Sequence, residues 1–192
     1  MSVEELSRRI VRDLVSGVSP LDEVERGHQD DILAWIDSGH DLFRMVPPAD
    51  PPKHLAVYFA LFDDELGAVM MVDHKKAAAW LLPGGHVDPY EDPRVTALRE
   101  AEEELQIAGK FHDLTGDAPL FVSVTETRGA HSHTDVTLWF VLKASQSELF
   151  RPDPGEFAAV EWFNLRGTAW DGDRFDPNMA RFVRKLVQLA SS

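Results

Sequence analysis

Three glutamates in the middle of the chain are spaced so that a helix would bring their carboxylates together. Glu100, Glu103 and Glu104 stand at positions i, i+3 and i+4. At about 100° per residue they fall within roughly 100° of one another around a helix axis. Apolar residues fall on the opposite side, where they can pack against a sheet: Leu98, Ala101 and Leu105. One helix therefore presents an apolar back and a front of three carboxylates.

This carboxylate front favours a divalent cation. Carboxylates at this spacing repel each other by a few tenths of a kcal/mol per exposed pair, and burial in a cleft increases the repulsion. Mg2+ takes carboxylate oxygens and keeps several waters, whose places phosphate oxygens can take. A bare run of glutamates is more often a solvated helix face. Here the run is tied at fixed distances to the turn Gly84-Gly85 and to Glu91, and this favours the metal site.

The stretch 84–107, GGHVDPYEDPRVTALREAEEELQI, resembles the Nudix box, G-x5-E-x7-R-E-U-x-E-E-x-G-U, in which U is a bulky apolar residue. The first glycine and every charged position match: Gly85, Glu91, Arg99, Glu100, Glu103 and Glu104. Ile107 fills the last apolar position, and Ala101 is a small version of the first. Gln106 stands where the box has its closing glycine. We expect either a left-handed Gln106, at a cost on the order of 1 kcal/mol, or a helix that continues toward Gly109.

The resemblance implies a Nudix-type α/β/α sandwich with a mixed sheet. It implies Mg2+-dependent hydrolysis of a diphosphate linkage in a small phosphorylated substrate, a nucleoside diphosphate derivative or a nucleoside triphosphate. Mn2+ is the expected substitute ion. Glu100, Glu103 and Glu104 would be the metal ligands in such an enzyme.

The same resemblance assigns roles to the rest of the box. Glu91 and Arg99 would form an ion pair that holds the loop on the helix, and Gly85 would let the backbone approach the metal or a phosphate. The general base would be a box glutamate or a carboxylate outside it. Glu156 lies just before a predicted strand, where some family members have a further metal-binding or basic glutamate. A solvated loop glutamate is an equally good interpretation of Glu156, and Glu126 competes for the role.

Other side chains are candidates for substrate binding. His131 and His133 share a face if their segment is extended, and they could donate hydrogen bonds to a phosphate or a ring. Arg44 and Arg128 could hold phosphates, and Trp139 could stack on a base. The competing interpretations are surface histidines and arginines, and a core tryptophan within a strand.

Composition limits the classes of protein. The chain has no cysteine, which excludes disulfides, thiolate zinc sites and cysteine nucleophiles. A net charge of −14 disfavours DNA and RNA, whose phosphates attract basic surfaces. There is no apolar run of about 20 residues and no signal peptide pattern, so we expect no membrane partner and a cytoplasmic location.

The periodicity of apolar residues predicts two parts. Residues 1–46 are predicted to form a helical extension. One helix is expected over 2–16, with Ser2 and Glu5 as its capping box, and a second over 20–38, with Ser19 as its N-cap. Their apolar stripes are expected to cap the pocket or to form a homodimer contact. Residues 47–192 read as the Nudix domain. Strands are expected over 55–62, 68–72, 79–82, 120–127, 134–142 and 159–163, with helices over 93–105 and 177–190, the last capped by Asp176.

Two alternatives use the same fold. A non-catalytic nucleotide-binding Nudix module would more often have a degraded box, whereas this box keeps every charged position. An isopentenyl-diphosphate isomerase depends on a cysteine, which this chain lacks. A plain structural protein would leave the carboxylate front unexplained.

Overall fold

The computed structural model describes residues 1–127 and 132–191, so Arg128 and His131 lie outside the described residues. The helices are α1 (Val3–Ser16), α2 (Glu23–Asp37), α3 (Pro93–Leu105) and α4 (Met179–Ala190). The strands are β1 (Lys53–Asp63), β2 (Ala68–His74), β3 (Ala79–Leu81), β4 (Gly84–His86), β5 (Phe121–Glu126), β6 (Thr134–Lys143) and β7 (Phe157–Asn164). Within the described ranges no helix is both long and apolar enough to cross a membrane.

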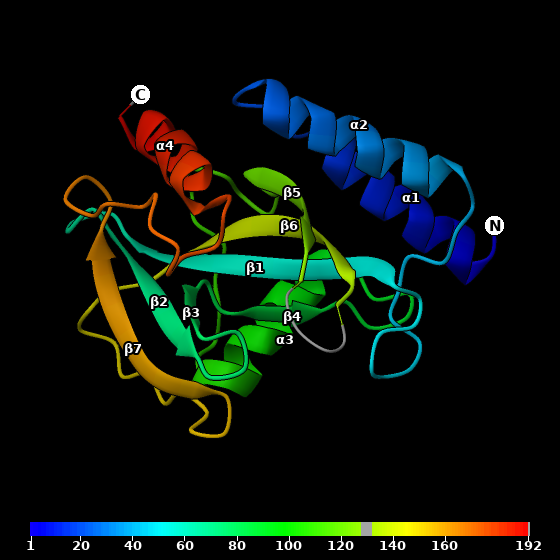
Figure 1. Ribbon diagram of the computed structural model, residues 1–192. Helices are drawn as coiled ribbons and strands as arrows, with labels where there is room; N and C mark the ends of the chain where they lie inside the picture. Colours follow the sequence, from blue (N-terminus) through cyan, green and yellow to red (C-terminus); the bar gives the residue numbers. More distant parts are fainter. Residues whose placement is uncertain (128–131, 192) are drawn as a thin grey trace.

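The strands form one mixed sheet. Its order is β3-β2-β1-β6-β5, with β4 paired to β1 and β7 paired to β2. β1 runs parallel to β6, and these two strands lie side by side through the middle of the molecule (Figure 1). The other pairings are antiparallel. The mixed sheet with flanking helices that the sequence predicts is therefore confirmed.

The sheet is covered on both faces because successive residues of β1 point in opposite directions. Leu61 joins the core that includes Ala101 and Leu105 of α3. Phe62, the next residue, joins a second core that includes Phe182 of α4. This burial on both faces explains why β1 is an almost continuous apolar run. The helix α3 is thus fixed on one face, and it carries the predicted metal ligands on its other side.

The ends of α3 follow from local signals. Asp92 is the N-cap, and its side chain accepts a hydrogen bond from the backbone N–H of Arg94. Pro93 takes the first helical position, where its missing N–H costs nothing. The helix ends at Leu105, and Gln106 is left-handed, with φ of 56°. The first of the two expectations for Gln106 is therefore the one observed.

Two predicted helix starts are wrong by a few residues. The helix α2 begins at Glu23 with Asp22 as its N-cap, not at Pro20, because the Asp22 side chain accepts from a first-turn N–H. Asn178 precedes α4 as its N-cap position, in place of the predicted Asp176. Asp176 instead accepts a hydrogen bond from the backbone N–H of Asn178, at 2.7 Å.

The N-terminal helices bury part of their apolar surface within this chain: Val11 and Val15 of α1, and Ile32, Trp35 and Ile36 of α2. The helix α2 packs on β5, the last strand in the sheet order, and α1 packs on α2 (Figure 1). Glu25 of α2 is 0% exposed. Its carboxylate accepts from Lys185 Nζ of α4 at 2.6 Å and from the backbone N–H of Val122 on β5 at 3.4 Å. Both helices are therefore tied to the sheet and to α4.

This buried ion pair leads to a stability prediction. Replacing Glu25 with Ala leaves Lys185 buried without its carboxylate, and such a loss costs about 3–5 kcal/mol of unfolding free energy. Chemical denaturation should show this loss for Glu25→Ala. The matched control is Glu23→Ala, since the Glu23 side chain is 92% exposed and its removal should change stability by less than about 0.5 kcal/mol. Equal stabilities for the two variants would contradict the assigned pairing.

Candidate active site

The box glutamates differ in their exposure. Glu104 is 7% exposed, and its carboxylate accepts a hydrogen bond from the backbone N–H of Gly84 on β4, at 3.0 Å. The Glu100 side chain is 13% exposed, whereas that of Glu103 is 58% exposed. The front of α3 therefore runs from a buried carboxylate beside β4 to one that faces solvent.

Arg99 holds the loop before α3 and the front of the helix together. Its guanidinium lies 3.1 Å from the Glu91 carboxylate, 2.8 Å from that of Glu100 and 3.1 Å from that of Glu103. Thr96 donates a hydrogen bond to Glu91 at 2.7 Å. The structure thus contains the Glu91–Arg99 ion pair that the box resemblance implies. One cation serves three carboxylates, so much of the negative charge on this face stays uncompensated.

The two glycines before the loop form strand β4 and not only a turn. Gly84–His86 pairs antiparallel with residues 56–58 of β1. A Cβ at Gly84 would lie 2.0 Å from the carbonyl oxygen of Val57, so no side chain fits there. A Cβ at Gly85 would lie 2.5 Å from Glu100 Oε1. Sequence patterns missed this strand because it is three residues long and two of them are glycine, a poor strand former.

The buried carboxylates are electrostatically crowded. Burial, together with the nearby carboxylates of Glu100 and Glu156, raises the pKa of Glu104 to about 9. Burial also raises the pKa of Glu100, against the opposing effect of Arg99. Carboxylates that share a site in this way take up either a proton or a cation. The donor set is made of oxygens only, and it therefore fits Mg2+.

Glu156 belongs to this group of carboxylates, and Glu126 does not. Glu156 lies one residue before β7, with its backbone N–H bonded to Asp153 and its carbonyl bonded to Lys75 N. Its side chain hydrogen-bonds to that of Glu104 and raises the pKa of Glu104. Glu126, at the end of β5, accepts a hydrogen bond from Ser132 Oγ at 3.3 Å. Of the two carboxylates considered outside the box, the structure brings Glu156 to the site.

The predicted substrate-binding residues lie in different surroundings. Arg44 lines a shallow hollow with His86, next to the loop that leads to α3. Trp139 is 0% exposed, and its indole N–H donates to Ser123 Oγ at 2.9 Å, so its burial favours the core interpretation. His133 lies beside β6. His131 lies outside the described residues.

A further group of side chains, which was not predicted from the sequence, lies at the ends of β1, β4 and β6. His54, His86, His133 and Asp135 bring one potential ligand atom each within 4.8 Å of one another. The alternate spacing of His133 and Asp135 is a signal in the sequence, since both then point to one face of an extended segment. The two other histidines join only through the pairing of β1 with β4 and β6.

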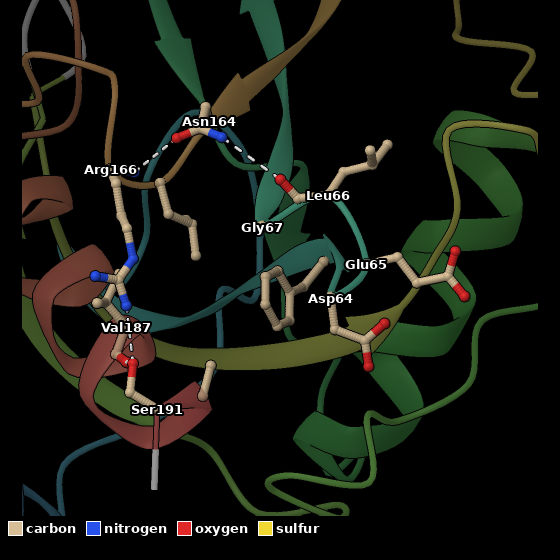
Figure 2. A pocket seen from close by; sticks show the side chains of 11 residues that line it. Asp64, Glu65, Leu66, Gly67, Asn164, Arg166, Val187 and Ser191 are labelled. Carbon is tan, nitrogen blue, oxygen red and sulfur yellow. Dashed lines mark hydrogen bonds between the residues drawn. The ribbon is translucent and has the colours of Figure 1, made fainter.

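The protein has a second hollow, whose lining contains none of these residues. It lies between the β1–β2 turn and the end of α4, and none of the predicted site residues line it (Figure 2). Asn164 and Arg166 are occupied there by hydrogen bonds to Leu66 and Ser191 respectively. Its residues therefore have structural partners, and we do not place the chemistry there.

The comparisons with known proteins show the family of this chain. Residues 52–186 match the NUDIX domain, so the chain belongs to the NUDIX family. Its fold, and a box that keeps every charged position, are those of a Nudix-type hydrolase.

The individual relatives either match only part of this chain or share little of its sequence. A CMP-5'-(N-acetyl-N-hydroxy-3-aminopropyl)phosphonate hydrolase of Streptomyces rubellomurinus is 46% identical over 52 residues. That match covers 26% of this chain and 25% of the relative, about a quarter of each. A NUDIX-family hydrolase from Clostridium perfringens has a TM-score of 0.54 at 22% identity, covering 71% of this chain and 97% of that one. The NUDIX domain of Shewanella oneidensis NrtR, solved with ADP ribose, has a TM-score of 0.55 at 19% identity, covering 81% and 96%. These structures show the shared fold.

Proposed function

We propose that the protein hydrolyses a diphosphate linkage in a nucleoside diphosphate derivative or a nucleoside triphosphate, with Mg2+ as its cofactor. The observation that carries the proposal is the group of Glu100, Glu104 and Glu156, in which burial and the two other carboxylates raise the pKa of Glu104 to about 9. The uncompensated charge of this group disfavours an anionic substrate. A bound divalent cation reverses that field.

Each box residue has a distinct task in this proposal. Glu100, Glu103 and Glu104 hold the ion. Arg99 and Glu91 keep the loop on the helix through their ion pair. The bound ion would neutralise the diphosphate oxygens and lower the pKa of a water.

Glu156 is our candidate for the general base. A base must come within about 2.6–3.2 Å of the proton that it takes, and Glu156 is the carboxylate from outside the box that reaches Glu104. An ionised Glu156 would accept the proton of the attacking water. Holding the ion with the box glutamates is its second role in the proposal.

The substrate lies on the β4 side of the box in this proposal. Gly85 lets the Glu100 carboxylate lie against the backbone of β4, since any side chain there would collide with it. Arg44 lies in the adjoining hollow, where its guanidinium can pair with a phosphate of the substrate. Because a non-catalytic module would need none of the base chemistry, the presence of Glu156 beside a box that keeps every charged position favours hydrolysis.

A substrate screen tests the proposal. The panel should hold nucleoside triphosphates, nucleotide sugars, ADP-ribose, dinucleoside polyphosphates and CMP joined to a phosphonate, each with Mg2+. We expect turnover of at least one compound with release of two phosphorus-containing products, read by 31P NMR. The Glu103→Gln variant is the control for contaminating hydrolases, and it should be inactive. Tight binding of a nucleotide without any turnover across the panel would instead support the non-catalytic module.

A further inference from the structure

Three strand ends place four potential metal ligands on one face of the sheet. Parallel pairing of β1 and β6 sets His54 beside Asp135. Antiparallel pairing of β1 and β4 sets His86 beside Ala56, which lies on the same face as His54. His133 is two residues before Asp135 and shares that face as well. The group therefore results from the register of the sheet and is not a chance contact of long surface side chains.

The distances from Asp135 to the three histidines match those of a tetrahedral metal site. The Nε2 atoms of His54 and His86 each lie 3.5 Å from Asp135 Oδ1, and that of His133 lies 3.2 Å from it. Zinc bonds to imidazole nitrogen and carboxylate oxygen are about 2.0–2.1 Å long, so neighbouring ligand atoms of a tetrahedron lie about 3.3–3.4 Å apart. The three spacings to Asp135 thus lie close to the edges of a zinc tetrahedron.

The hydrogen bonds around His54 determine which of its nitrogens faces the group. The Nδ1 atom lies 2.6 Å from the carbonyl oxygen of Pro51, which can only accept a hydrogen bond. Nδ1 therefore carries the hydrogen of the neutral ring, and Nε2 presents a lone pair to Asp135. Metal-binding histidines are held in this way, with the other nitrogen donating to a carbonyl.

His133 can take the same orientation. Its Nδ1 lies 3.1 Å from Thr127 Oγ1, a hydroxyl oxygen that can accept a hydrogen bond from it. With Nδ1 as the donor, Nε2 faces Asp135 with a lone pair, 3.2 Å from Oδ1. Two nitrogen lone pairs and a carboxylate oxygen repel one another unless a cation lies between them.

The burial of the group makes this repulsion costly. His54 is 0% exposed, and among the described residues its Nε2 has no hydrogen-bond partner. The same holds, within that part of the chain, for Nε2 of His86 and Oδ1 of Asp135. Buried polar atoms are nearly always satisfied, so several unsatisfied atoms aimed at one point indicate a missing ligand.

We propose that His54, His86, His133 and Asp135 bind one Zn2+ ion, at a site distinct from the carboxylates of α3. Three imidazoles and one carboxylate suit zinc, whereas Mg2+ prefers oxygen ligands. Four protein ligands close the tetrahedron, which is the arrangement of a structural zinc site. The ion would fasten β4 to β1 and β6. It would thereby position Gly85, the residue before His86, against Glu100.

Metal analysis of protein freed of any affinity tag tests the proposal. We expect one zinc ion per chain after incubation with Zn2+ and gel filtration, and a rise in melting temperature. Cobalt should give the intense visible absorption of a tetrahedral ion. His86→Gln and Asp135→Asn should weaken zinc binding by more than the roughly 10- to 100-fold that loss of an outer-shell partner causes.

Two controls separate this site from general metal binding. His112→Gln removes another buried histidine beside a carboxylate, His112 Nε2 lying 3.5 Å from Asp64 Oδ2, and it should keep the zinc. Glu103→Gln alters the proposed magnesium site and should keep the zinc as well. Wild-type protein that retains no zinc overturns the proposal. So does full zinc retention by both His86→Gln and Asp135→Asn, or an octahedral cobalt spectrum.

Discussion

Replacing Glu104 with Gln should lower turnover by roughly 100-fold or more while the fold stays intact. Glu104 is buried and fixed by Gly84 N–H, so the amide keeps the shape of the side chain but removes the charge that would hold the metal. Glu103→Gln should also lower turnover by orders of magnitude, because Glu103 shares the same front. The measurement is kcat at saturating Mg2+, with circular dichroism to check the fold.

The control for these two variants is Glu102→Gln. Glu102 is on the same helix, it is exposed, and it occupies a position that the box leaves open. It should keep wild-type turnover. Near-normal kcat for both Glu103→Gln and Glu104→Gln would show that the assigned ligands are wrong.

Glu104 should also make the metal-free protein sensitive to pH. Its folded pKa of about 9 lies above its ordinary value of 4.5, chiefly through burial. The folded state then binds the proton more tightly than the unfolded state, so the contribution of Glu104 is most favourable at low pH and is lost as pH rises from about 4.5 to about 9. Without metal, the melting temperature of Glu104→Gln should exceed that of the wild type by a margin that grows over this range. Each kcal/mol of unfolding free energy corresponds to a shift of roughly 2–4 °C in melting temperature.

Glu156→Gln should cause a much larger loss of turnover than Glu126→Gln. Glu156 hydrogen-bonds to Glu104, whereas Glu126 is bonded to Ser132 at the end of β5. If Glu156 is the base, kcat should fall roughly 100-fold or more. Kinetics of both variants at saturating Mg2+ test the assignment, and the reverse ranking would transfer the role to Glu126.

Local signals in the sequence were enough to predict the helix of the site. Its apolar positions pack on the sheet and its predicted start at Pro93 is correct, while its end before a left-handed Gln106 is one of the two ends expected. The Glu91–Arg99 contact also followed from a fixed separation along the chain. Glu156 could be proposed only from its position before a strand, because its approach to Glu104 depends on the pairing of β7 with β2.

The histidine group could not be predicted from local patterns. His54 and His86 meet only because β4 pairs with β1 in a particular register, and Asp135 joins them because β6 pairs with β1. A shift of one residue in either pairing would turn a ligand to the opposite face. The start of α2 was missed for a different reason, since Ser19 and Pro20 form a good helix start that Asp22 outcompetes through its hydrogen bond.

The dependence of hydrolysis on Mg2+ tests the central claim most directly. The protein should be treated with excess chelator, separated from it by gel filtration, and assayed on the best substrate of the screen with Zn2+ alone, Mg2+ alone and both. We predict no turnover in chelator or with Zn2+ alone, and turnover that rises with Mg2+ when one equivalent of Zn2+ is present. Full activity in excess chelator, or full activity with Zn2+ alone, would contradict a magnesium site on the carboxylates of α3.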